Sequence, residues 1–441
     1  MVFIHPTEEE ITGEVIDKFI KLHQAEIPRY LRLKELYESR PEILNKEEKE
    51  AYKPDNRLVV NHAKNIVDNF NGYFVGIPVK INHEDTKVDE RVNNFIKNND
   101  MDDNLAELSK IASIYGRAFE LLYQDEESMP RCIYNDPLDM FIVYDDSVAQ
   151  NPLFAVRYWR NEDGELRGQL FTASHEVSIS EGKDGLILSD EKTHYYGDVP
   201  VIEYLENEER TSIFEPVETL INAYDNAVSL KMNDIDYFAD SYMKVLGAEI
   251  EQKGLNAIRD NRIINLFGAD TDKLIVEFME KPNADNIQEN LLNRLEKLIY
   301  QISMVSNISQ EDFGNSSGVA LEFKLQSMKN LAIMKERKFT SGMNKRFKML
   351  FNIITFVEAS KRDEWRNLEY TFKRNIPRNL SDEAETAGKL AGIVSKETQL
   401  SILSIVDNTA SEIEKINNDL EETTVYPSDE KGDFLTENKK E

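Results

Sequence analysis

Four carboxylates stand close together in the sequence, beside segments with strand character. Asp136 and Asp139 are three residues apart, and Asp145 and Asp146 follow a short apolar run. Paired carboxylates can act as acid and base, or hold Mg²⁺ for phosphoryl transfer. Turns at strand ends also favour Asp, because its side chain bonds the nearby backbone. The cluster therefore indicates either a metal-dependent hydrolase or ordinary turn chemistry, and we favour turn chemistry.

The other side chains that carry chemistry form no catalytic signature. The sequence lacks a GxxxxGK[ST] phosphate-binding loop and the GxGxxG, HExxH, GxSxG and EF-hand patterns. Its six histidines fit no metal template, so we expect a structural role for His62 in a helix and surface or capping roles for the others. Cys132 is the single cysteine, which excludes an internal disulfide and a CxxC zinc site. We predict a protein that is not an enzyme and that uses no metal or cofactor.

Composition limits the class of protein. The chain has 441 residues, with 82 acidic and 53 basic side chains and a net charge of −29. This charge argues against a protein that coats nucleic acid or an anionic membrane. Hydrophobic residues make up 40%, enough for packed cores in two or three domains. No targeting segment or apolar run of about 20 residues is visible, so we expect a soluble protein made in the cytosol.

The apolar pattern predicts alternating helices and strands in the first half of the chain. Short strand-like runs separated by turns indicate a β-meander over 141–204, with a hairpin turn at Asn161-Glu162-Asp163-Gly164. Before the meander, helices are predicted at 60–74 and about 103–114, and strands at 79–82 and 118–123.

The next part is predicted to consist of two long helices with an insertion between them. Pro216 suits a first helical position, and an apolar stripe of helical period continues to Tyr242. A second stripe covers 287–305. Between the helices, 263–267 and 274–278 have strand composition, so a small insertion interrupts the helical pair.

A polar loop rich in Gly and Ser, residues 306–318, opens into the longest predicted helix. Its apolar stripe extends over 321–357, about 60 Å at 1.5 Å per residue. Residues 365–373 resemble a strand. Three short helices then begin at Ser381, near Ser395 and at Thr409, before a tail from about 423 that has little to bury.

Basic residues gather on the longest predicted helix, against the acidic trend of the chain. Three interpretations stay open: a solvated helix face, pairing with the acidic surface of a neighbouring subunit, or direct phosphate binding. No aromatic residues alternate with them as stacking platforms would require. The basic positions are Lys324, Lys329, Lys335, Arg337, Lys338, Lys345, Arg346 and Lys348.

Five short segments carry a family resemblance when they are taken in order, namely 56–67, 72–79, 115–120, 317–325 and 376–379. They make the chain similar to the portal proteins of tailed bacteriophages, in particular those of long-tailed phages of Gram-positive hosts. The resemblance spans about residues 50 to 420. At Glu322 the chain departs from the basic residue that family members often carry.

This resemblance implies an α+β fold, predominantly α. The portal-like subunit would have a wing, a two-helix stem, a small α/β clip, a tunnel loop followed by a long helix, and a helical crown. The implied boundaries are 1–214 for the wing, 215–245 and 283–306 for the stem helices, 246–282 for the clip, 307–318 for the tunnel loop, 319–379 for the long helix and a wing strand, 380–422 for the crown and 423–441 for a disordered acidic tail.

The implied function is a ring, usually of twelve subunits, at one vertex of the capsid, through which double-stranded DNA is packaged and ejected. The implied partners are further copies of the chain, the DNA, the terminase large subunit, the head–tail adaptor, and the major capsid and scaffolding proteins, with no membrane. The protein would reside in the virion after assembly in the host cytoplasm. Its negative charge suits a conduit, because an acidic wall repels phosphates and leaves the duplex free to slide.

Two groups of residues are the implied contact sites, and two other functions remain open from the residues. One alternative is the hydrolase built on the four Asp residues, and the other is an acidic scaffold or adaptor without a channel. The tunnel loop would face DNA through Ser309, Gln310, Glu311, Asp312, Asn315, Ser316 and Ser317. The clip would meet the motor and the adaptor through Arg259, Arg262, Asn265, Phe267, Asp270 and Asp272.

Overall fold

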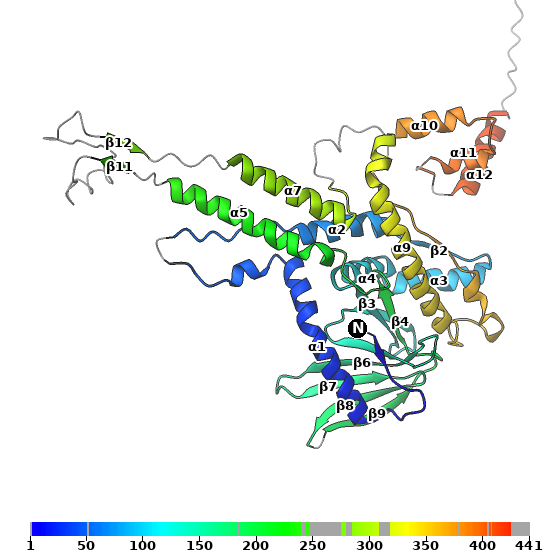
Figure 1. Ribbon diagram of the computed structural model, residues 1–441. Helices are drawn as coiled ribbons and strands as arrows, with labels where there is room; N and C mark the ends of the chain where they lie inside the picture. Colours follow the sequence, from blue (N-terminus) through cyan, green and yellow to red (C-terminus); the bar gives the residue numbers. More distant parts are fainter. Residues whose placement is uncertain are drawn as a thin grey trace, which may run out of the picture. The chain divides into compact units, whose positions relative to one another are not determined.

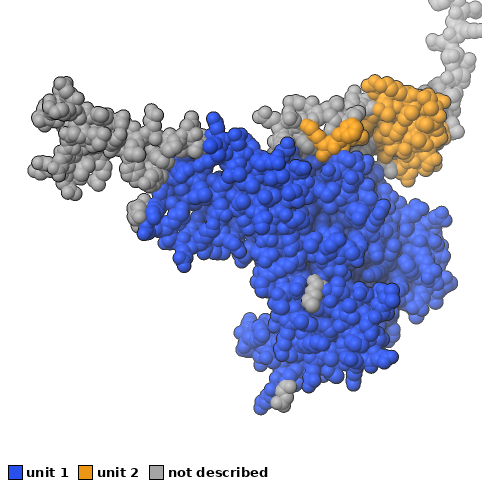
Figure 2. Space-filling model, viewed as in Figure 1, with its two compact units in different colours: residues 1–308, 325–375 blue, residues 309–324, 376–441 orange. Residues whose placement is uncertain are grey.

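Helices and sheets both contribute to the fold. Of the residues that the structure describes, half are helical and 19% are in strands, which confirms a mixed helix and sheet fold. The chain divides into two compact units, residues 1–308 with 325–375 and residues 309–324 with 376–441 (Figure 2). The computed structural model describes residues 2–50, 53–183, 185–239, 243–246, 275–278, 285–307, 318–376, 380–403, 405–406 and 408–424.

The first unit contains a six-stranded sheet in the order β1-β5-β6-β7-β8-β9. Neighbouring strands are antiparallel, except that β1 pairs with β5 in parallel. The predicted hairpin is confirmed, since Gly164 closes the turn between β6 and β7 by donating to the Asn161 carbonyl at 2.9 Å. The strands are β1 (Phe3–Ile4), β5 (Met140–Tyr144), β6 (Pro152–Arg160), β7 (Leu166–Phe171), β8 (His175–Gly182) and β9 (Gly185–Thr193).

The two faces of this sheet are covered by different elements, because successive side chains of a strand point to opposite sides. On one face, Phe141 and Phe154 pack with Phe19 of α1 (Gly13–Tyr37), a helix that lies across the strands (Figure 1). On the other face, Ile142 packs with Phe119, which belongs to a second sheet. Residues 140–144 are buried on both faces, which explains their continuous apolar run.

The second sheet has the order β10-β3-β4 and is antiparallel. It consists of β3 (Arg117–Gln124), β4 (Pro130–Asn135) and β10 (Val201–Leu205). The predicted meander therefore ends at β9, because β10 leaves the larger sheet to pair with β3. Helices α2 (His62–Val75), α3 (Thr86–Asn98) and α4 (Met101–Tyr115) complete this region, and β2 (Lys80–Asn82) pairs with β13 (Glu369–Thr371).

Two helices and a strand pair occupy the segment predicted as helix, insertion, helix. They are α5 (Glu218–Ala239), α7 (Asp285–Ser303), β11 (Met243–Leu246) and β12 (Ile275–Phe278). The apolar stripe predicted that the first helix extends to Tyr242, and the resemblance implied a stem helix that extends to residue 245. Residues 243–246 instead pair with 275–278 as antiparallel strands. The β-branched Val245, Ile275 and Val276 favour this pairing. The second predicted strand, 274–278, is confirmed, whereas 263–267 lies outside the described residues.

Helix α9 (Gly318–Leu350) has 33 residues and a length of about 50 Å. It ends before the predicted residue 357, because the chain turns back and buries the remaining apolar side chains from a different direction. Phe356 packs on Phe95 and Phe351, while Ile354, which the helical stripe included, is 81% exposed. The Asn352 amide fixes this turn by donating to the Tyr196 carbonyl at 2.6 Å.

The second unit contains α10 (Leu380–Lys389), α11 (Lys396–Ser401) and α12 (Thr409–Thr424). Helix α11 starts near Ser395 as predicted, and Ser395 caps it by accepting from the Thr398 amide. Ser381 lies inside α10 rather than at its cap, and Asn408 rather than Thr409 accepts from the Ser411 amide at the start of α12. The sequence pattern therefore predicted these three helices, but it placed the first residue of α10 two residues late and the cap of α12 one residue late.

Candidate functional site

The implied tunnel-loop and clip residues lie outside the described part of the chain. This holds for Ser309, Gln310, Glu311, Asp312, Asn315, Ser316, Ser317, Arg259, Arg262, Asn265, Phe267, Asp270 and Asp272. The elements that flank them are described. The clip segment is bordered by β11 and β12 with α5 and α7, and the tunnel-loop segment lies between α7 and α9.

Helices α5 and α7 lie side by side (Figure 1). They are antiparallel, because Lys231 of α5 pairs with Glu289 near the start of α7, and Gln288 donates to Asp234 at 2.9 Å. Leu292, Leu295 and Ile299 of α7 are buried.

Helix α7 carries a second apolar stripe that is not covered by the part of the chain that the structure describes. Ile287 is 72% exposed, Leu291 50% and Ile302 47%. These residues fall within a sector of about 60° on the helix, since successive residues are 100° apart. Leu230 and Ile235 of α5 are also exposed. The helical pair therefore carries exposed apolar side chains on both of its helices.

The middle of α9 is anchored by a buried ion pair. The Lys335 ammonium lies 2.6 Å from Glu206, and it donates to the Ser109 carbonyl at 2.9 Å and to the Ser113 hydroxyl at 2.8 Å. Burial lowers the pKa of Lys335, and Glu206 opposes that shift. Three aromatic rings surround the ammonium, with centroids 5.2–5.4 Å from it, and they belong to Phe70, Phe74 and Phe339.

A second buried ion pair holds the same helix near its end. The Arg346 guanidinium donates to both oxygens of Glu120 at 2.9 Å, and the Tyr204 hydroxyl donates to the same carboxylate at 3.0 Å. Both charged side chains are 1% exposed. Burial disfavours the charge of Arg346, but Glu120 outweighs it and raises the pKa of the guanidinium.

These pairs correct part of the sequence interpretation of the basic residues on this helix. Lys335 and Arg346 are buried, so they do not form a solvated helix face. They pair with acidic side chains of the same chain rather than with a neighbouring subunit. Two further members are also paired within the chain, Lys338 with Glu208 and Lys348 with Asp198. The acidic partners of these basic residues lie on β3, just before β10 and just after it, far away in the sequence, so no local spacing signals them.

The four candidate catalytic carboxylates divide between turns. Asp136 accepts from the Leu138 amide at 2.9 Å, and Asp145 accepts from the Ser147 and Asn151 amides at 3.2 and 2.9 Å. Asp146 accepts from Thr7. Burial raises the pKa of Asp139, and the neighbouring Asp136 adds to that shift. Within the described residues, no group of three or more His, Cys, Asp and Glu side chains is placed to hold a metal ion.

The expectation of surface histidines is wrong for His5 and His23, which are buried. The Nδ1 of His23 lies 2.9 Å from the Tyr158 hydroxyl, and its Nε2 lies 2.9 Å from the Pro137 carbonyl. The carbonyl can only accept, so Nε2 carries the proton and Nδ1 accepts from Tyr158. Burial lowers the pKa of His23 to about 4, and the Pro137 bond opposes it.

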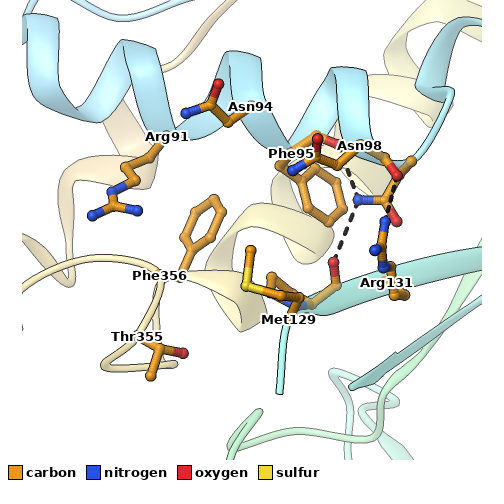
Figure 3. Close-up of a pocket in the computed structure, with 10 residues that line it drawn as sticks. Arg91, Asn94, Phe95, Asn98, Met129, Arg131, Thr355 and Phe356 are labelled. Atoms are coloured by element: carbon orange, nitrogen blue, oxygen red, sulfur yellow. Dashed lines mark hydrogen bonds between the residues drawn. The ribbon is translucent and has the colours of Figure 1, made fainter. Parts of the chain in front are cut away.

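A small cavity of about 80 Å³ lies between α3, the start of β4 and the turn after α9 (Figure 3). Arg91, Asn94 and Asn98 line it from α3, and Phe356 and Met129 form an apolar wall. The Asn99 amide behind it donates to the Phe95 and Pro130 carbonyls. The four candidate carboxylates do not line this cavity, so it offers no paired acid and base.

The sequence reading also missed a polar row on α5 formed by Asp225, Ser229 and Asn233, all buried. Their spacing of four residues was the available signal, since it places three polar residues on one face of the helix. Among the helices that the structure describes, none is both long enough and apolar enough to cross a membrane.

Comparison with known proteins assigns the chain to a family. Residues 16–425 match the family model described as phage portal protein, SPP1 Gp6-like. The chain belongs to this family. The portal protein of Bacillus phage SPP1 is 26% identical over 392 residues, covering 83% of this chain and 77% of that protein. The portal protein of Clostridium phage phiCD119 is 22% identical over an alignment of 457 positions, covering 96% of this chain and 98% of that protein.

Among solved structures, a chain from the virion of a native gene transfer agent (GTA) particle is similar with a TM-score of 0.45 and 9% identity, over 77% of this chain and 89% of that one. Portal proteins are structural, non-enzymatic components of phage virions, and they form ring oligomers in the capsid. Membership in this family therefore excludes the hydrolase.

Proposed function

We propose that this chain is the repeating subunit of a ring-shaped channel at one capsid vertex, through which double-stranded DNA is packaged and later ejected. The match to portal proteins over residues 16–425 carries the proposal, because it covers both stem helices, the long helix and the crown segment in one run. In this assignment α5 and α7 are the stem, β11 and β12 belong to the clip, and α10 to α12 form the crown.

The clip would dock the terminase motor during packaging and the head–tail adaptor afterwards. The segment between α7 and α9, with Ser309 to Ser317, would face the DNA. A ring of twelve subunits would let each stem cover the apolar stripe of the next. The exposed Ile287, Leu291 and Ile302 support this arrangement, because large apolar side chains gathered on one helix face mark an interaction site.

Light scattering and negative-stain images of the purified chain test the ring. We expect a particle of about 600 kDa with a central hole, close to twelve chains of 51.0 kDa each. Leu291→Glu should shift the particle toward single chains, because it buries a charge in the contact. Asn293→Glu is the matched control, since it adds the same charge on the opposite, exposed face of α7 and should leave the ring intact.

A wild-type chain that forms no ring at any concentration or salt would overturn the proposal. If Leu291→Glu and Asn293→Glu lose rings to the same extent, the apolar stripe of α7 is not the contact between subunits. The channel is tested in assembled particles, where a shortened 309–317 segment should reduce DNA packaging while particles still form. Unchanged packaging would remove the DNA-facing role of that segment.

A further inference from the structure

Residues 54–61 form an extended segment that leads directly into α2; we call it the strap. The chain reaches it through residues 46–50, which are exposed, after a 3₁₀ turn (Glu42–Asn45). Figure 1 shows this blue stretch following α5 toward its outer end. The strap lies on the face of α5 that carries the buried polar row.

Every second backbone amide of the strap donates to a side chain of α5. The three acceptors are buried, so water does not compete for these bonds. The bonds run antiparallel to the helix. They join the Val60 amide to Asp225 Oδ1 at 2.8 Å, the Leu58 amide to Ser229 Oγ at 2.8 Å, and the Asn56 amide to Asn233 Oδ1 at 2.6 Å.

The geometry of the two elements explains why the contact repeats. Residues four apart on an α-helix are separated by about 6.0 Å along its axis, and residues two apart in an extended chain by about 6.6 Å. Over two steps the mismatch is about 1.2 Å. Side chains of different length absorb it, because the short Ser229 stands in the middle and the longer Asp225 and Asn233 stand at the ends.

The inner end of the strap is tied to three other helices. The Asn61 side chain donates to the Tyr37 carbonyl at the end of α1 at 2.8 Å, and it accepts from the Lys64 amide to cap α2. The next residue, His62, sets its ring against Tyr224 of α5 and Tyr300 of α7, with centroid distances of 4.6 and 5.7 Å. The strap and His62 therefore connect both stem helices to α1 and α2.

We infer that the strap is a clamp that sets the position of the stem helices on the first unit, and that Asp225, Ser229 and Asn233 are its positioning residues. Successive amides of an extended chain point to opposite sides, so a shift by one residue would turn Arg57 and Val59 toward α5 and break all three bonds. The contact therefore accepts one register. Its importance for ring closure rests on the proposed function, whereas the clamp itself does not.

Residue-resolved hydrogen exchange on the full chain tests the clamp. The amides of Asn56, Leu58 and Val60 should exchange at least about tenfold more slowly than those of Arg57 and Val59, although the strap belongs to no sheet. A variant with Asp225→Ala, Ser229→Ala and Asn233→Ala should lose this alternation. Asn222→Ala is the matched control, because that side chain lies on the same helix and makes no hydrogen bond to the described residues.

If the triple variant does not fold, the single variant Ser229→Ala tests the clamp. It should speed hydrogen exchange of the Leu58 amide and leave the Val60 amide protected. Uniform exchange along the wild-type strap, or a Leu58 amide unaffected by Ser229→Ala, would overturn the clamp.

Spin labels test the positioning role separately. Leu31→Cys on α1 and Leu230→Cys on α5 place labels at exposed sites, and the native Cys132 is buried. With excess unlabelled chain, the label distance should be narrowly distributed and should broaden in the triple variant. An unchanged distribution would overturn positioning by the strap. Ring formation is scored in parallel, so a wild-type chain without rings would count against the proposed function and leave both clamp measurements valid.

Discussion

The ammonium of Lys335 lies 2.6 Å from the carboxylate of Glu206, and both side chains are shielded from solvent. Lys335 belongs to α9 and Glu206 follows β10, so the pair ties the long helix to the smaller sheet. A buried pair of this kind contributes little net stability compared with apolar residues, but removing one partner strands a charge. The pair therefore fixes where α9 sits more than how stable the first unit is.

Glu206→Gln should lower the free energy of unfolding by about 3–5 kcal/mol, because it leaves Lys335 charged and buried without its counter-ion. The double variant Lys335→Met with Glu206→Met should recover most of that loss. Urea denaturation followed by circular dichroism measures both. Lys329→Met is the control on the exposed face of α9, and should change stability by less than about 0.5 kcal/mol. If Glu206→Gln leaves the free energy of unfolding unchanged, the Lys335 ammonium must reach water.

Gly342→Ala should destabilise the first unit by about 1–3 kcal/mol. A Cβ at residue 342 would lie 2.6 Å from the ring of Tyr204, which cannot retreat because its hydroxyl is bonded to Glu120. Helix propensity alone predicts a gain of about 1 kcal/mol from the same change. Thermal unfolding therefore decides between the two effects. Ser341→Ala, one residue earlier and exposed, should not destabilise the helix.

Asp225→Asn should stabilise the chain at pH 8 and have little effect near pH 4. Burial raises the pKa of Asp225 from 3.8 to about 6, with the Val60 amide opposing it, so the folded state binds a proton more readily than the unfolded state. Stability from this group is present below pH 3.8 and falls as pH rises to about 6. Asparagine keeps the acceptor for Val60 and removes the charge.

The gain at pH 8 should be about 1–2 kcal/mol after allowing for partial solvent screening. Urea midpoints at pH 4 and pH 8 measure it, with Asp163→Asn in the exposed hairpin turn as the control. Equal effects of Asp225→Asn at both pH values would contradict the raised pKa.

The effect of His23 on the pH dependence of stability should be opposite to that of Asp225. The pKa of His23 is lowered from 6.5 to about 4 by burial, so its stability contribution is present above pH 6.5 and is lost as pH falls to about 4. The full loss corresponds to about 3 kcal/mol. His23→Gln should flatten the pH dependence of the urea midpoint over this range. His175→Gln, at a partly exposed histidine, is the control, and a flat wild-type profile would refute the assignment.

Repeating local patterns were sufficient to predict several elements. Helix α7 and the β6–β7 hairpin follow directly from a 3.6-residue stripe and from a turn sequence between strand-like runs. Residues 13–37 and 86–98 were not singled out as helices, although both form one. Pro28 lies inside the first, and the apolar stripe of that helix, which includes Ile16 and Phe19, packs on the large sheet.

Burial of charge could not be predicted, because it depends on partners far away in the sequence. In the sequence, Lys335 is one of eight basic residues on a helix that could be solvated. Only its contacts with Glu206 and Ser113 in the folded chain show that it is buried. The polar row on α5 was hidden for the same reason, since its acceptors are satisfied by strap amides about 170 residues earlier.

The exposed stretch at 46–50 separates two anchored parts of the chain. Before it, α1 packs on the large sheet and Arg29 pairs with Glu215; after it, the strap is bound to α5. Cutting the peptide there would leave both fragments held by contacts that do not pass through the cut. This stretch is therefore suited to carry an inserted epitope or fluorescent domain, which would mark the subunit in assembling particles without occupying either terminus.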